Sequence, residues 1–157
     1  MILSSDTLTI DDIEAYINAD EITIDDASYN RIQKSRDLVE QIVAEGRTSY
    51  GINTGFGKFS ETKISDVEIN ELQRRIVLSH ACGIGDPMPD RIVRIMMILK
   101  LKSYCYGFSG CSMPVVNMLR DMLNNKIYPI VPEKGSVGAS GDLAPLPHIA
   151  LAMIGEG

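Results

Sequence analysis

The chain has 157 residues, which is enough for one domain with a hydrophobic core. Its net charge is −6 with the acidic residues spread along the sequence, which argues against nucleic acid or an anionic membrane as a partner. No signal peptide, membrane-spanning run or metal-ligand cluster is apparent, and Cys82, Cys105 and Cys111 show no pairing pattern, so we expect a cytoplasmic protein with reduced thiols.

Capping residues, apolar periodicity and Gly/Pro stops predict a mainly α protein with a few short strands and Gly-rich loops. Thr9 is expected to cap the first helix, Asp25 or Asp26 to open the second, and Asp142 to cap the last. The first expected helix runs from Ile10 to about Ala19, the second from Asp25 or Asp26 to about Glu45, and the third from the capping box 65–68 to about His80. Three more run from about Asp90 to Tyr106, from about Ser112 to Asn124, and from Leu143 to Ile154. A short strand is expected at 22–24.

Two of these helices are too apolar to be covered by this chain alone. Residues 92–101 carry apolar side chains at almost every angle around the helix, and residues 149–154 have no polar side chain. A helix that is apolar all round is buried all round. We therefore expect further segments of a larger α-helical protein, or partner subunits, to cover them.

Residues 139–141, Ala-Ser-Gly, can make an electrophile from the backbone. In a bent loop the amide nitrogen of Gly141 can attack the carbonyl carbon of Ala139, and loss of water closes a five-membered ring. Loss of a second water from Ser140 leaves a 4-methylidene-imidazol-5-one. Standard side chains include no good electrophile, so such a ring points to elimination or migration of an amino group. The alternatives are a plain Gly/Ser loop and, less favoured, a hydrolase nucleophile at Ser140, which lacks the G-x-S-x-G context.

Tyr50 and His80 are the other candidates for chemistry. Tyr50 precedes a loop containing Gly51, Gly55 and Gly57, and a phenol can act as acid or base if its surroundings lower its pKa. The alternative is a half-buried core tyrosine. His80 continues an apolar helical stripe, where its ring needs hydrogen-bond partners, so it is either a satisfied core histidine or a ligand contact. His148, inside the last apolar helix, is interpreted as packing.

Three stretches, 50–57, 72–83 and 135–157, resemble in order and approximate spacing the signature segments of the histidine and aromatic amino acid ammonia-lyases. The resemblance runs from about residue 3 to the last residue, and covers the N-terminal third or so of a typical family member. It implies that residues 1–157 are the N-terminal part of one ammonia-lyase domain, ending after the helix that follows the electrophile. It also implies a long helical bundle, a homotetramer and active sites shared among subunits.

The resemblance also implies roles for single residues. Ala139, Ser140 and Gly141 would form the methylidene-imidazolone ring without metal or nucleotide, supported by Asp142 and Gly57, with the ring at the start of the last helix. Tyr50 would help remove the β-proton of the substrate. Substrate-binding residues would be His80, which would contact an imidazole, and Asn53.

The pair Ser79-His80 and the residues 52–54 are closest to the histidine type of the family, which implies conversion of L-histidine to trans-urocanate and ammonia. Some tyrosine-type members also carry a histidine at this position. A tyrosine or phenylalanine ammonia-lyase or an aminomutase therefore remains an alternative.

The sequence departs from the family pattern at Cys111-Ser112, where members usually have Val-Arg, and at Pro147, where a small residue is common. The asparagine, further tyrosines, arginine and acidic residue that the family also needs lie in later segments. We therefore expect the isolated chain to be inactive. A piece that only associates with full-length subunits is the non-enzymatic alternative.

Overall fold

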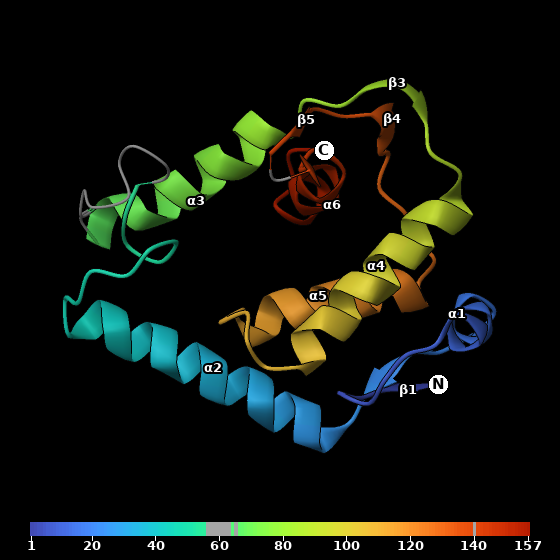
Figure 1. Cartoon of the computed structure of the whole chain (residues 1–157), viewed down its shortest axis with the longest axis horizontal. Coiled ribbons are helices and arrows are strands. Elements are labelled where there is room, and N and C mark those ends of the chain that lie inside the picture. The colour runs from blue at the N-terminus through green and yellow to red at the C-terminus, as the bar shows by residue number, and fades with distance from the viewer. Residues whose placement is uncertain (56–63, 65, 140) are drawn as a thin grey trace.

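The structure, a computed structural model, describes residues 1–55, 64, 66–139 and 141–157, and it is mainly helical as the sequence predicts (Figure 1). Three short two-stranded sheets join the helices within these ranges, pairing β1 with β2, β3 with β4 and β5 with β6. In chain order the elements are β1 (Ile2–Leu3), α1 (Ile10–Ile17), β2 (Thr23–Ile24), α2 (Asp26–Ala44), α3 (Asp66–His80), β3 (Ile84–Pro87), α4 (Asp90–Cys105), α5 (Met113–Asn124), β4 (Pro132–Lys134), β5 (Val137–Gly138), β6 (Gly141–Asp142) and α6 (Pro145–Met153).

The first two helix starts follow from their capping side chains. Thr9 and Asp12 form a reciprocal capping box, in which the Thr9 hydroxyl accepts from the Asp12 amide and the Asp12 carboxylate accepts from the Thr9 amide. Asp25, and not Asp26, caps α2 by accepting a 2.9 Å hydrogen bond from the Ser28 amide. The predicted cap of α3, Ser65, lies outside the described residues.

The last helix begins later than the sequence predicts. The N-cap position of α6 is Ala144, and the predicted cap, Asp142, belongs to strand β6. Because Asp142 pairs with Val137 across a small hairpin, its backbone is extended and cannot enter the helix. Its carboxylate instead accepts a 3.0 Å hydrogen bond from the Ala144 amide, which closes the turn before the helix.

The core is built around α4. The face of α4 that carries Met97, Ile98 and Leu101 is fully buried, and it packs with Leu119 and Leu123 of α5. Helices α1 and α2 also contact α4, while α3 packs mainly on α6 (Figure 1). The chain therefore has a main core around α4 and α5, and α3 and α6 form a second layer joined to it.

The apolar helices keep exposed faces in this chain. Ile92 and Leu99 on α4 are each 43% exposed, and Leu146 and Ile154 at the two ends of α6 are similarly open. The apolar pattern thus has no cover on these faces within the described residues. The expectation that further segments or subunits cover them stays a prediction.

One buried charge holds three helices together. Arg94 of α4 is 6% exposed, and none of its hydrogen-bond partners is a carboxylate. Its guanidinium donates to main-chain carbonyls at the C-terminal ends of α1 and α5, where the regular ladder of helical hydrogen bonds stops. The partners are the carbonyl oxygens of Tyr16, Ile17, Ala19 and Leu123 and the hydroxyl of Tyr128, at 2.7 to 3.3 Å.

Replacing Arg94 with methionine should lower the free energy of unfolding by about 3 kcal/mol, because buried carbonyls would lose their donor. Urea denaturation followed by circular dichroism measures this change. The matched control is Arg91→Met on the same helix, whose ion pair with Glu14 is exposed to solvent and should contribute little to stability. Equal losses in the two variants would contradict the role given to Arg94.

Candidate active site

The chain turns sharply at the candidate tripeptide. Strands β5 and β6 are antiparallel, and Gly138 pairs with Gly141, so only two residues connect them. Ala139 is exposed, and Gly141 has φ +89°, a left-handed conformation that glycine adopts without strain. Ser140 lies outside the described residues. Ala139 and Gly141 thus lie at the end of a hairpin, and the formation of the ring stays a prediction.

Asp142 fixes the base of this loop. Its carboxylate binds the Ala144 amide and also fills the space beside Gly135, where a Cβ atom would come within 2.0 Å of Oδ1. Any side chain at Gly135 would displace the carboxylate. Asp142 is therefore not a helix cap, and its supporting role toward the ring stays a prediction. Because α6 begins only at Pro145, the loop lies farther from a helix N-terminus than predicted.

His80 is the last residue of α3 and is half-buried. Its Nδ1 lies 2.8 Å from the carbonyl oxygen of Ile76 and 3.1 Å from the hydroxyl of Ser79. A carbonyl only accepts, so this contact assigns the proton to Nδ1. In the neutral ring Nε2 is then an acceptor, and no described residue binds it. His80 is held in place by its own helix and can offer Nε2 to a ligand.

Asn53 organises the loop that carries Tyr50. Its side chain is fully buried, with Oδ1 accepting from the Ser49 amide at 2.8 Å and Nδ2 donating to the Arg47 carbonyl at 2.9 Å. Its own carbonyl accepts from the Ile64 amide. Asparagine often closes turns in this way, a signal in the sequence that was missed. The substrate-binding role of Asn53 stays a prediction, while its polar groups already serve the loop.

Tyr50 is 63% exposed on the turn that Asn53 stabilises, and Gly57 lies outside the described residues. The next residues, Gly51 and Ile52, line a cavity of about 280 Å³ together with Ile69, Asn70 and Gln73 of α3. This contact places the Tyr50 loop beside the first half of α3.

The predicted residues fall into two groups in one chain. His80 lies roughly two helical turns beyond the part of α3 that contacts the Tyr50 loop. Figure 1 shows this loop near one end of α3 and β5 near the other. The structure thus brings His80 toward the 135–142 region through the packing of α3 on α6, and leaves Tyr50 apart.

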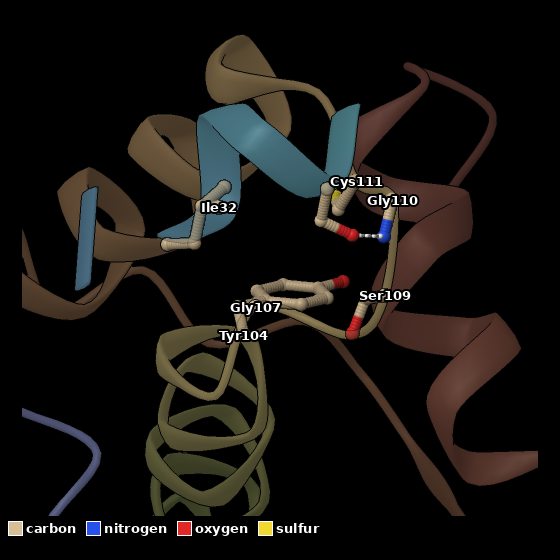
Figure 2. Close-up of a pocket in the computed structure, with 7 residues that line it drawn as sticks. Ile32, Tyr104, Gly107, Ser109, Gly110 and Cys111 are labelled. Atoms are coloured by element: carbon tan, nitrogen blue, oxygen red, sulfur yellow. Dashed lines mark hydrogen bonds between the residues drawn. The ribbon is translucent and has the colours of Figure 1, made fainter. Parts of the chain in front are cut away.

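A second pocket, shown in Figure 2, lies between α2 and the loop after α4 and is lined mostly by half-buried residues. It is too small to admit a water molecule, and the Gly110 amide donates to the Ser35 hydroxyl across it at 2.8 Å. Burial raises the pKa of the Tyr104 phenol and of the Cys111 thiol, so both stay neutral at neutral pH. Cys111, a departure from the family pattern, is therefore a packing residue beside Tyr104.

Within the described ranges, no three His, Cys, Asp or Glu side chains gather closely enough to hold a metal ion. None of the helices described there has both the length and the apolar character needed to cross a bilayer.

Comparison with known proteins agrees with this fold. The family model for aromatic amino acid lyases matches residues 8–157. A histidine ammonia-lyase of Shouchella clausii is 49% identical over 158 residues, which cover 100% of this chain and 32% of that protein. The crystal structure of histidine ammonia-lyase from Trypanosoma cruzi matches with a TM-score of 0.88 and 36% identity over 99% of this chain and 30% of that one.

The ergothioneine-degrading enzyme ergothionase from Treponema denticola matches with a TM-score of 0.92 and 31% identity, over 99% of this chain and 31% of that one. The chain thus spans about a third of the length of these relatives. The match of the family model to nearly the whole sequence, on a helical fold shared with solved lyases, shows that the chain belongs to the aromatic amino acid lyase family.

Proposed function

We propose that this chain is the N-terminal part of a histidine ammonia-lyase, which converts L-histidine to trans-urocanate and ammonia. The observation that carries the proposal is the hairpin at 138–141, with Gly141 at φ +89°, in a chain 49% identical to a histidine ammonia-lyase. A tight bend at Ala-Ser-Gly is what a backbone cyclisation requires, and glycine is the residue that tolerates it.

The residues around the loop fit a methylidene-imidazolone formed from Ala139, Ser140 and Gly141. Ala139 is exposed, so its carbonyl carbon is open to attack, and Asp142 is fixed against Gly135 at the base of the loop. Two waters leave as the ring forms, one from the Ala139 carbonyl oxygen and one from the Ser140 side chain. Once formed, the ring would supply an electrophile that turns the substrate amine into a better leaving group.

The side chains of this chain have two tasks around that group. The phenolate form of Tyr50, exposed on its turn, would take the weakly acidic β-proton of the substrate and become the phenol. His80, with Nδ1 occupied by the Ile76 carbonyl, would accept the N–H of the substrate imidazole at Nε2. This hydrogen bond would orient the ring and select histidine.

Two features support a site shared between subunits in a homotetramer. In one chain the Tyr50 loop lies beside the first half of α3, whereas His80 is the last residue of that helix, so the Tyr50 of another subunit would have to complete each site. The exposed apolar faces of α4 and α6 provide surface for such packing.

The alternative substrate is tyrosine, in an ammonia-lyase or an aminomutase. Nε2 of His80 can accept from a phenol O–H as well as from an imidazole N–H. Assays of the complete enzyme with L-histidine, L-tyrosine and L-phenylalanine separate these activities, and a preference for tyrosine would overturn the proposed substrate.

In a complete enzyme that carries this segment, the peptide containing Ser140 should be lighter than its sequence by two waters. Ser140→Ala should prevent loss of the second water, because alanine has no hydroxyl to eliminate. Peptide mass spectrometry measures the mass deficit in the parent and in the variant. Urocanate formation should fall in the Ser140→Ala variant, because the complete ring does not form. An unmodified parent peptide in an active enzyme would refute the proposed electrophile.

Tyr50→Phe should lower kcat by about 10²- to 10⁴-fold, because the proton acceptor is lost. The melting temperature should change little, since the Tyr50 side chain is 63% exposed. Tyr106→Phe is the matched control: it removes a hydroxyl from another exposed tyrosine outside the site. Wild-type turnover by the Tyr50 variant would rule out its role as a base.

A further inference from the structure

His148 makes a contact that packing alone does not explain. Its Nε2 accepts a 3.0 Å hydrogen bond from the backbone amide of Gly83, 65 residues away. An amide N–H only donates, so Nε2 carries the lone pair and Nδ1 carries the proton of a neutral ring. The ring thus joins the segment after α3 to helix α6.

Gly83 lies in a slot that is shaped for this bond. A Cβ atom at Gly83 would meet His148 Nε2 at 2.9 Å and Pro132 Cβ at 3.1 Å, so a larger residue would push the ring away. On the other side, Ile84 pairs with Lys134 of β4. The segment between α3 and β3 is therefore held by both β4 and His148.

A continuous series of hydrogen bonds leads from this slot to the 139–141 loop. The His148 amide donates to the Ala144 carbonyl at 3.1 Å, and the Ala144 amide donates to the Asp142 carboxylate at 3.0 Å. Asp142 pairs with Val137 in the hairpin. At the other end, the Cys82 amide donates to the His80 carbonyl at 2.9 Å, so His80 adjoins the slot.

We propose that His148 is a positioning residue, whose hydrogen bond to the Gly83 amide sets the place of the His80 ring relative to the 139–141 loop. The inference rests on the proposed function, in which His80 binds the substrate ring and the loop reacts with the amine. His148 touches neither substrate nor reacting atoms in this account. It acts by fixing the distance between the His80 ring and the 139–141 loop, the two groups that contact the substrate.

The test compares His148→Leu with His148→Gln in a complete enzyme that carries this segment. Leucine removes the acceptor, whereas the Oε1 of glutamine can take the place of Nε2. We expect His148→Leu to raise KM for L-histidine about tenfold, with the two-water mass deficit intact, and His148→Gln to restore most of the affinity.

A double-mutant cycle shows whether the effect passes through His80. In a His80→Ala background, His148→Leu should cause no further rise in KM, because the ring it positions is absent. An equal rise in both backgrounds, or equal defects in the leucine and glutamine variants, would overturn the proposal and leave His148 a structural residue.

The outcome for His148 is separable from the outcome for the proposed function. If the parent enzyme acts on another aromatic amino acid, the same cycle is run on that substrate. If the parent has no turnover, the Gly83 amide and the His80 ring are followed by NMR. His148→Leu should then speed exchange of the Gly83 amide and shift the His80 resonances while glutamine does neither, and an unchanged Gly83 amide overturns the proposal.

Discussion

The fold depends on two buried cations of α4 whose hydrogen-bond partners among the described residues are main-chain carbonyls and one hydroxyl, with no carboxylate. Arg94 donates to carbonyls at the C-terminal ends of α1 and α5, where the regular ladder of helical hydrogen bonds stops. Lys102, 5% exposed and two turns farther along, donates to the Ser4 and Asp6 carbonyls. Taking charges out of water is costly, and here main-chain dipoles compensate that cost. Helix α4 thereby fixes the chain segments that surround it.

Local sequence signals predicted the elements well where the deciding contact is local. Thr9 was predicted to cap the first helix and Asp25 or Asp26 to open the second, and both helix starts involve residues within one turn of each other. The Gly141 bend also follows from a single residue type. The apolar character of α4 was visible as well, but the sequence did not indicate which groups Arg94 binds. Its partners come from α1 and α5, which no local pattern connects to it.

The site was harder to predict because its residues act at long range. Asp142 was predicted to be a helix cap because an Asp that precedes a helix commonly has that role. Only its pairing with Val137 and the close approach of Gly135 show that Asp142 belongs to the hairpin instead. His148 was predicted to be a packing residue, and its hydrogen bond from the Gly83 amide is visible only in the structure. Asn53 was assigned to the substrate, whereas its amide is engaged with residues 47 and 49 of its own loop. The roles of Tyr50 and His80 came from resemblance, and a single chain does not test them.

The separation of the Tyr50 loop from His80 along α3 has a genetic consequence. If each site takes one residue from one subunit and the other from a neighbour, a subunit defective in Tyr50 damages a different site from a subunit defective in His80. Two inactive alleles, one for each residue, would then complement when co-expressed, because some mixed assemblies would contain sites with both residues intact. When one defective allele is co-expressed with a normal allele, each defective subunit would also inactivate a site to which a normal subunit contributes.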